Sequence, residues 1–321
     1  MISDQALGAA LQRGMTGRVV VGLDRRPSAY RTSCGLEEVD VELDDGERIE
    51  LMFKHLARAA LVPQARDVKP RFLYDPLREI ELYRDVLDGA GLGTPHFHGA
   101  VPEHGWLFLE RVRGFELYQV GERATWEHVA RRLAQMHERL AATATRAPRA
   151  IRYDAAWYRR WPQRALRFAA RRAEPGALRE LERLADAYEP VIERLLALPT
   201  TVIHGEFYAS NVLVDDPVRP RRVAPVDWEQ AGIGPGLVDL AALTAGGWSD
   251  DDRDAIAAAY CAAAADGSSD AEFAGGLEAC RLHLAFQWLG WSEDWAAPEE
   301  HRQDWLAEAG RAAARLAGAA R

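Results

Sequence analysis

The chain of 321 residues is organised around one stretch, residues 201–230, which reads TVIHGEFYASNVLVDDPVRPRRVAPVDWEQ. Two short β-branched runs, 201–203 and 212–214, predict strands, and the polar segment between them contains a glycine suited to a tight bend. A proline-rich connection then leads to a third apolar run at 223–226. We expect this run to turn back and pair with 212–214 as an antiparallel hairpin.

The open end of this hairpin gathers polar side chains. If the hairpin is centred near Arg219, Asn211 and Asp227 lie opposite each other there. A carboxylate beside a carboxamide supplies the hard oxygen ligands that Mg²⁺ accepts when it shares its shell with waters and phosphates. Glu206, on the same loop, could orient an attacking hydroxyl and take its proton. The spacing alone leaves a second interpretation open, a surface hairpin with scattered acids and no shared site.

The same residues carry a resemblance to a known family. They resemble the central motif of the aminoglycoside phosphotransferase and choline kinase-like family, whose members are small-molecule relatives of the protein kinases. The residues that match are His204-Gly205-Glu206, Asn211 and Val226-Asp227-Trp228-Glu229. The resemblance implies that ATP and Mg²⁺ are the cofactors, that Asn211 and Asp227 bind the metal, and that Glu206 acts with them in catalysis. One position departs from the family pattern. Glu206 stands where the family usually has Asp, so its carboxylate lies one methylene further from the backbone.

The resemblance covers the whole chain in the order of its elements and implies a bilobal, protein-kinase-like α+β fold. We expect a nucleotide-binding lobe at 1–110, made of an antiparallel sheet with one inserted helix, and a mostly helical catalytic and substrate lobe at 111–321. An apolar content of 48% is enough to form a core of this size. In the family an Asp-Leu-Ala segment follows the metal-binding acid, and Asp239 matches the residue that braces the catalytic loop.

One lysine of the N-terminal part is the candidate for binding phosphates. Lys54 lies on the second strand of a predicted hairpin, where a lone lysine is usually a solvated surface charge. The next helix begins at Asp75-Pro76. The resemblance implies that Lys54 pairs with Glu79 of that helix and holds the α- and β-phosphates. Glu81 is the competing partner, about 200° further round the helix.

The loop 23–35 is where a kinase lobe covers the phosphates. It has neither of the glycine signatures GxGxxG and GxxxxGK[ST]. Ser28 and Ser33 offer hydroxyl groups that could contact phosphate. An ordinary polar turn is equally compatible with this composition.

The adenine contacts are expected further along the N-terminal lobe. The strand 106–112 resembles the family's entry into the hinge, so backbone groups of Glu110 and Val112 are expected to meet the adenine edge. Met52, on the same strand face as Lys54, would cover the base or else fill the core.

Three tryptophans near the C-terminus recur at helical spacing, Trp288, Trp291 and Trp295. In related enzymes the late helices build the pocket for the phosphate acceptor. A stripe of this kind is more often part of a hydrophobic core, and we predict the core role here.

Composition excludes several classes of protein. The net charge of −9 argues against a surface that wraps nucleic acid and is compatible with a cationic substrate. The sequence has no apolar run long enough for a membrane span and no signal peptide pattern at its start, so we expect a cytoplasmic protein. Three widely spaced cysteines fit neither a disulfide framework nor a metal site.

The sequence therefore predicts a kinase that moves the γ-phosphate of ATP to a hydroxyl group of a small molecule such as a sugar, an aminoglycoside or an amino alcohol. Two alternatives stay open. Glu206 and the glycine-poor loop are compatible with a nucleotide-binding pseudokinase, and the same chemistry could serve a Ser or Thr of a peptide during natural-product maturation. Nothing in the sequence indicates the acceptor or the oligomeric state.

Overall fold

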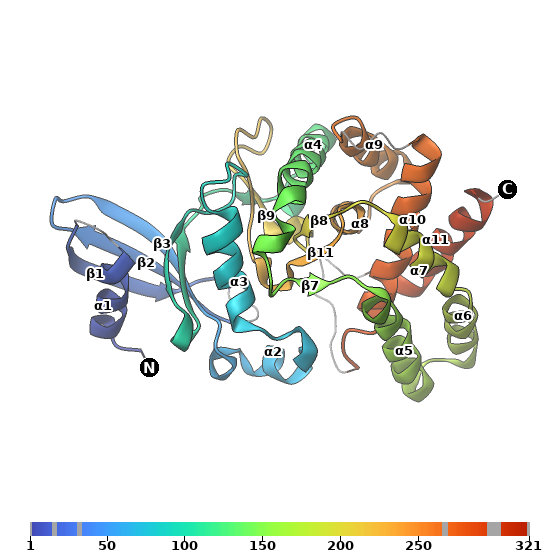
Figure 1. Cartoon of the computed structure of the whole chain (residues 1–321), viewed down its shortest axis with the longest axis horizontal. Coiled ribbons are helices and arrows are strands. Elements are labelled where there is room, and N and C mark those ends of the chain that lie inside the picture. Colours follow the sequence, from blue (N-terminus) through green and yellow to red (C-terminus); the bar gives the residue numbers. More distant parts are fainter. Residues whose placement is uncertain (1, 15–17, 31–33, 265–268, 294–302, 320–321) are drawn as a thin grey trace.

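The computed structural model describes residues 2–14, 18–30, 34–264, 269–293 and 303–319. A strand-rich N-terminal lobe and a larger, mostly helical C-terminal lobe lie side by side (Figure 1). The predicted α+β, protein-kinase-like fold class is confirmed. In the part of the chain that the structure describes, every helix is too short or too polar to span a membrane.

The N-terminal lobe is built on a five-stranded antiparallel sheet in the order β1-β2-β3-β5-β4. The strands are β1 (Val20–Pro27), β2 (Gly35–Leu43), β3 (Arg48–His55), β4 (Phe97–Val101) and β5 (Trp106–Glu110). The hairpin expected around Lys54 is β2–β3. Its turn contains Gly46 with φ at +82°, a backbone conformation that favours glycine.

The two faces of this sheet have different roles. On one face Leu51 and Phe53 of β3 are buried against Leu11 of α1 (Asp4–Gly14). Because side chains alternate along a strand, Lys54 points to the opposite face. That face is turned towards the C-terminal lobe.

Two helices connect β3 to β4, the short α2 (Pro63–Val68) and α3 (Pro76–Leu82). As predicted, α3 begins after Asp75, whose carboxylate accepts a hydrogen bond from the Leu77 amide at 3.0 Å. The helix continues into a π-helical turn, Tyr83–Leu87. Figure 1 shows α3 between the N-terminal sheet and the C-terminal lobe.

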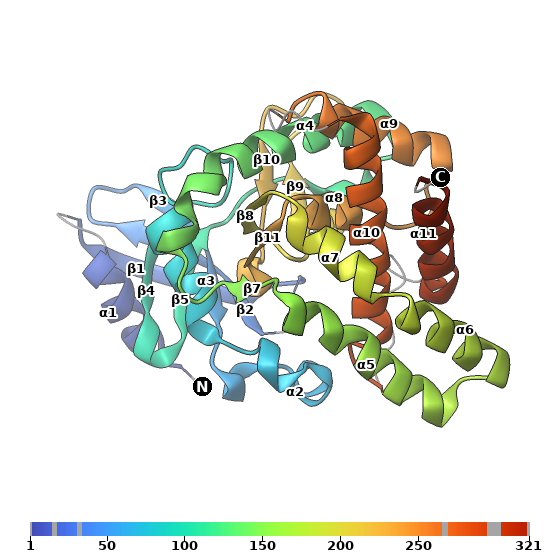
Figure 2. The same ribbon diagram turned by 45° about the vertical axis from the view of Figure 1, so that its right-hand side comes forward.

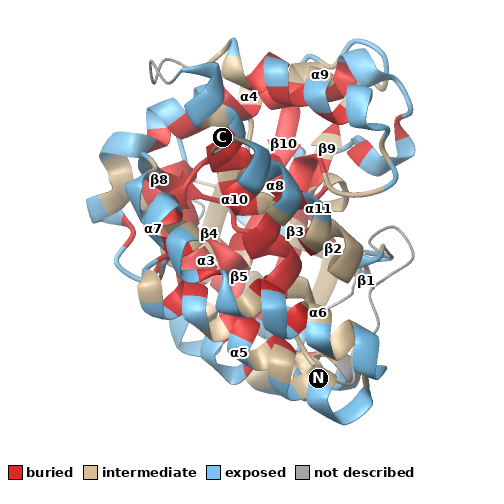
Figure 3. Cartoon of the chain, turned by 90° about the vertical axis from the view of Figure 1, so that its right-hand side faces the viewer, coloured by how far each residue is buried: buried red, intermediate tan, exposed pale blue. Residues whose placement is uncertain are grey.

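The C-terminal lobe packs around α10, which contacts α5, α7, α8 and α11 (Figure 2). Its helices are α4 (Arg123–Leu140), α5 (Ala155–Arg172), α6 (Pro175–Asp186), α7 (Glu189–Ala197), α8 (Leu237–Leu243), α9 (Asp250–Cys261), α10 (Asp270–Leu289) and α11 (Trp305–Ala319). Buried residues concentrate in α8 and α10 (Figure 3). A helix with neighbours on several sides needs apolar residues on several faces, which explains the composition of α10.

Two small sheets carry the central stretch of the sequence. One contains β10 (Val223–Pro225), β9 (Val212–Val214) and β6 (Phe115–Glu116), and the other β7 (Ile151–Arg152), β11 (Gly232–Pro235) and β8 (Thr200–Ile203). The expected hairpin is β9–β10. The Val226 amide donates to the Asn211 carbonyl at 2.9 Å, so Asn211 faces Val226, and Asp227 lies one residue beyond the expected position.

Candidate active site

Lys54 joins the two lobes. Its ammonium group lies 2.7 Å from both carboxylate oxygens of Glu79 on α3 and 2.8 Å from Oδ1 of Asp227, which follows β10. Burial alone would lower the pKa of Lys54, but the carboxylates of Asp227 and Glu79 raise it well above its usual value. The structure therefore holds a permanent positive charge between the lobes.

Glu79, rather than Glu81, is the residue of α3 that faces Lys54. Its carboxylate also accepts a hydrogen bond from the Trp228 amide at 3.1 Å, and its side chain is only 1% exposed. Burial raises the pKa of Glu79 to about 7, against the effect of Lys54. Glu81 instead binds Arg149 at 2.9 Å near the surface.

The backbone of Asp227 is strained. Its φ is +65° and its ψ is 64°, and no other non-glycine residue among those described has a positive φ. Such a conformation costs about 1–3 kcal/mol and persists where the surroundings hold it. His204 Nε2 donates to the Val226 carbonyl at 2.8 Å and so supports this segment. Burial opposes ionisation of Asp227, but Lys54 lowers its pKa.

Hydrogen bonds shape the loop that carries Glu206 and Asn211. The carbonyl oxygen of Glu206 accepts from Nδ2 of Asn211 at 2.9 Å and from the Tyr208 amide at 2.7 Å. Because the amide nitrogen of Asn211 is used within the loop, its Oδ1 is the atom left for a cation. Asn211 and Asp227 thus lie on adjoining segments of the β9–β10 hairpin.

Asp239 of α8 braces the same loop. Its carboxylate accepts from the amides of His204 at 2.7 Å and Gly205 at 2.8 Å, and it contacts His137 Nε2 at 3.0 Å. Gly205 has a φ of +82°, and an added Cβ would lie 2.3 Å from the Gln230 carbonyl oxygen. Only glycine fits there without a shift of the backbone.

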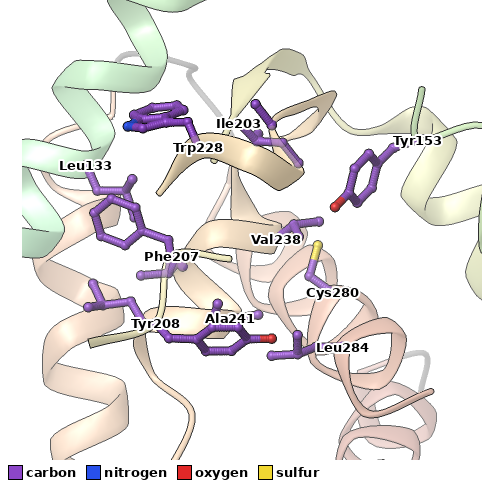
Figure 4. Packing of buried hydrophobic residues seen from close by; sticks show 14 of the residues in the cluster. Leu133, Tyr153, Ile203, Phe207, Tyr208, Trp228, Val238, Ala241, Cys280 and Leu284 are labelled. Carbon is purple, nitrogen blue, oxygen red and sulfur yellow. The ribbon is translucent and has the colours of Figure 1, made fainter. Parts of the chain in front are cut away.

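Two aromatic residues anchor the loop in the C-terminal core. Phe207 lies beside Leu133, and Tyr208 lies beside Ala241 and Leu284 (Figure 4). Both aromatic side chains are buried. The position of Glu206 is therefore set by the packing of the C-terminal lobe.

The electrostatic surroundings of Glu206 are acidic. Burial raises its pKa to about 8, and the neighbouring carboxylates of Glu229 and Asp227 add to this shift. Lys69 and Lys54 oppose it. The carboxyl group of Glu206 consequently titrates near neutral pH.

Comparison with known proteins identifies the family. A family model described as the phosphotransferase enzyme family matches residues 37–283. The chain belongs to this family. The matched region contains both partners of Lys54 and the whole loop from His204 to Asn211.

Solved structures share the fold of this member of the phosphotransferase enzyme family. The microcompartment-associated aminopropanol kinase has a TM-score of 0.60 and 16% identity, over 99% of this chain and 95% of that chain. A choline/ethanolamine kinase family protein from Mesorhizobium loti has a TM-score of 0.56 and 16% identity, over 94% and 88%. The streptomycin–ATP–APH(2'')-IIa ternary complex has a TM-score of 0.54 and 12% identity, over 99% and 97%. No protein with a curated description matches the sequence.

Lys69 is a residue of the site that the motif analysis missed. Its ammonium group lies 2.5 Å from Oε2 of Glu229, and its side chain is 8% exposed. The signal that could have revealed it is the composition of the phosphotransferase. Of its 40 basic residues only Lys54 and Lys69 are lysines, and both are buried beside the acids of this site.

The hinge residues have partners of their own. The Glu110 amide donates to the His96 carbonyl at 2.9 Å, and the Glu110 carboxylate binds Arg222 at 2.6 and 2.8 Å. The Glu110 amide is therefore not a free donor for an adenine base. Within the described residues the Val112 amide has no hydrogen-bond acceptor, so it is the better candidate.

Met52 is half-buried and belongs to neither cluster of buried side chains in the described residues. The neighbours of Met52 on the same face of β3 are the charged residues Glu50 and Lys54. The Arg111 guanidinium binds Glu38 at 3.0 Å, Asp40 at 2.9 Å and Glu50 at 2.5 Å. A base under Met52 would thus lie beside a fixed network of charges.

The expected phosphate loop is only partly described. Ser28 is 5% exposed, and its hydroxyl accepts a hydrogen bond from the Tyr30 amide at 3.3 Å. This contact belongs to a local turn. Ser33 lies outside the described residues.

The late tryptophans pack against the core, as predicted. Trp288 and Trp291 lie on the main cluster of buried side chains, and the Trp291 ring stacks on Trp161 at 6.1 Å. Trp295 lies outside the described residues.

Proposed function

We propose that this member of the phosphotransferase enzyme family transfers the γ-phosphate of ATP to a hydroxyl group of a small molecule. The observation that carries the proposal is Lys54, held 2.7 Å from Glu79 of the first lobe and 2.8 Å from Asp227 of the second. A preorganised cation at this position suits the negative charge of a polyphosphate. We assign nucleotide binding to residues 1–110 and catalysis to 111–321, and we expect the protein to act in the cytoplasm, where ATP is available.

The nucleotide would lie between the lobes. The Lys54 ammonium would bind the α- and β-phosphates, and the Val112 amide with the Met52 side chain would contact the base. The ATP in the ternary complex with a similar fold supports this choice of nucleotide.

The residues near Asp227 fit a magnesium ion. Oδ1 of Asn211 and the Asp227 carboxylate are hard oxygen donors. The described residues contain no group of three or more His, Cys, Asp or Glu that could hold a metal by itself, at this site or at any other. Phosphates and waters would complete the shell, as Mg²⁺ prefers. When bound, Mg²⁺ would neutralise phosphate charge and orient the γ-phosphate.

Glu206 is the proposed base. The acceptor oxygen attacks the γ-phosphorus while its proton passes to the Glu206 carboxylate, and the bond to the leaving ADP oxygen breaks. A pKa of about 8 lies near the working pH, which suits a group that must accept a proton.

The test is a screen of ATP-dependent transfer by phosphorus NMR and ADP release. Sugars, amino alcohols, aminoglycosides and Ser- or Thr-containing peptides are offered to the wild type and to Glu206→Gln. We expect transfer to a small-molecule hydroxyl that falls by about 10² or more in the variant. ATP binding without transfer to any acceptor would indicate a pseudokinase, and transfer to peptides alone would indicate a peptide kinase.

A further inference from the structure

A cavity of about 270 Å³ opens beside the loop that carries Glu206 and Asn211. It lies where η5 (Leu117–Gln119), the start of α4 and the end of α8 meet this loop. Figure 1 shows α4, α8 and α9 together in this part of the C-terminal lobe. We call it the tryptophan pocket, and its lining residues are Tyr118, Trp126, Tyr208, Ala209, Ala242, Ala245, Gly246, Gly247 and Trp248.

The walls of the tryptophan pocket are aromatic and uncharged. Within the described residues, its lining includes no acid and no base. The rings of Trp126 and Trp248 meet edge to face, with centroids 4.6 Å apart. Trp126 Nε1 already donates to the Val120 carbonyl at 2.7 Å, so this ring offers the pocket only its apolar surface.

Backbone hydrogen bonds connect this wall to the loop segments that carry Glu206 and Asn211. The Tyr208 amide donates to the Glu206 carbonyl at 2.7 Å, and the Asn211 amide donates to the Tyr208 carbonyl at 2.8 Å. Ala209, another lining residue, lies between Glu206 and Asn211 in the sequence. A molecule in the pocket would therefore border the loop of the proposed base.

Gly247 lines the pocket at an exposed position. A Cβ added there would have no atom within 4 Å, and its backbone is not in the left-handed region. Pockets for drug-sized ligands are typically about 300–1,000 Å³. The tryptophan pocket, at about 270 Å³, suits a body of one or two rings.

We propose that the tryptophan pocket holds the non-reacting part of the acceptor and that this part is neutral and ring-shaped, so that the substrate is an uncharged alcohol with an apolar, aromatic body. The inference rests on the proposed function and names its substrate class. A primary or secondary ammonium group, such as those of kanamycin, would lose its hydration in this pocket without a carboxylate to pair with. The acidic residues that give the chain its net charge of −9 therefore lie outside the lining of the pocket.

The test uses naphthylethanol as the probe, with choline and kanamycin as cationic comparisons. Binding to the full chain is measured by calorimetry and saturation-transfer NMR, with and without a non-hydrolysable ATP analogue. We expect naphthylethanol to bind and Gly247→Leu to weaken it at least tenfold. Gly176→Leu is the control, because a Cβ on this exposed residue of α6 also has no atom within 4 Å. Binding of the ATP analogue should be equal in all three proteins.

A second variant tests whether the uncharged lining selects a neutral ligand. Ala245→Asp places a carboxylate in the lining, and it should shift the preference from naphthylethanol towards naphthylethylamine at least tenfold. Unchanged naphthylethanol affinity in Gly247→Leu, or preferred phosphorylation of choline or kanamycin by the wild type, would overturn the inference. Probe binding with the expected variant effects, but without phosphate transfer to any alcohol, would count against the proposed function and not against the ligand class.

Discussion

Lys69 Nζ lies 2.5 Å from Oε2 of Glu229, an ion pair between the residue that follows α2 and the residue two places beyond Asp227. Both side chains are largely buried, at 8% and 18% exposure. Burial would lower the pKa of Lys69, but Glu229 raises it, with Glu206 and Asp227 adding to the effect. Lys69 is therefore the counter-charge to the acidic side of the site, as Lys54 is at Glu79.

The first prediction concerns Lys69. Lys69→Met leaves Glu229 buried without a partner, so the free energy of unfolding should fall by about 3 kcal/mol. Turnover should fall at least tenfold, because the carboxylates of Glu206, Asp227 and Glu229 then repel one another and the incoming phosphates. Arg66→Met on the exposed part of α2 is the control and should change neither quantity. Urea unfolding and steady-state kinetics measure both, and the double variant Lys69→Met/Glu229→Gln should regain most of the stability. A double variant as unstable as the single one would show that the pair itself is not the cause.

The second prediction separates charge from packing at Lys54. Lys54→Met should abolish transfer and lower the free energy of unfolding by about 3 kcal/mol, because the buried Glu79 loses its partner. Adding Glu79→Gln should restore stability without activity. The control is Glu81→Gln, which removes only a partly exposed pair with Arg149 and should cost about 0–1 kcal/mol. Recovery of transfer in Lys54→Met/Glu79→Gln would contradict the role of the ammonium group.

The third prediction uses the strained backbone of Asp227. Asp227→Ala and Asp227→Gly both remove the carboxylate, but only glycine adopts a φ of +65° without strain. We expect the glycine variant to be more stable than the alanine variant by about 1 kcal/mol. The alanine and glycine variants should both lose phosphate transfer. Asp227→Asn should also lose phosphate transfer but keep the fold. Equal unfolding midpoints for the glycine and alanine variants would argue against backbone strain.

The fourth prediction is a pH dependence at Glu206. The group has a pKa of about 8 in the folded protein and 4.5 as its ordinary value. Between these two values the unfolded chain releases the proton that the folded protein keeps. The stability contributed by Glu206 is therefore complete below pH 4.5 and declines as pH rises to about 8, by at most about 1.4 kcal/mol per pH unit.

Glu206→Gln removes this titration while keeping the shape of the side chain. Relative to the wild type, the variant should gain stability steadily from about pH 5 to about pH 8, and it should be the more stable protein at the upper end. Unfolding by urea at both pH values gives the difference, since groups far from Glu206 titrate alike in the two proteins. Parallel stability curves would show that Glu206 titrates as it does in the unfolded chain.

Local patterns in the sequence were sufficient for the fold class and much of the site. The β2–β3 hairpin follows from alternation and a glycine turn, and the α3 start follows from an Asp-Pro pair. The pairing of Lys54 with Glu79 came from the family resemblance, and helical periodicity allowed only one of Glu79 and Glu81 to face the lysine. These features depend on neighbours in the sequence or on a motif with fixed spacing.

The remaining features depend on how distant segments pack. The ion pair of Lys69 with Glu229, the positive φ of Asp227 and the partners of Glu110 each require contacts between segments far apart in the chain. The tryptophan pocket likewise joins residues from four segments, of which only the one with Tyr208 and Ala209 belongs to the central motif. By itself the sequence determined the β2–β3 hairpin, the start of α3 and the central motif, because each is encoded by near neighbours. Only the tertiary structure decided which charges meet and where room is left for an acceptor, because those depend on the packing of whole lobes.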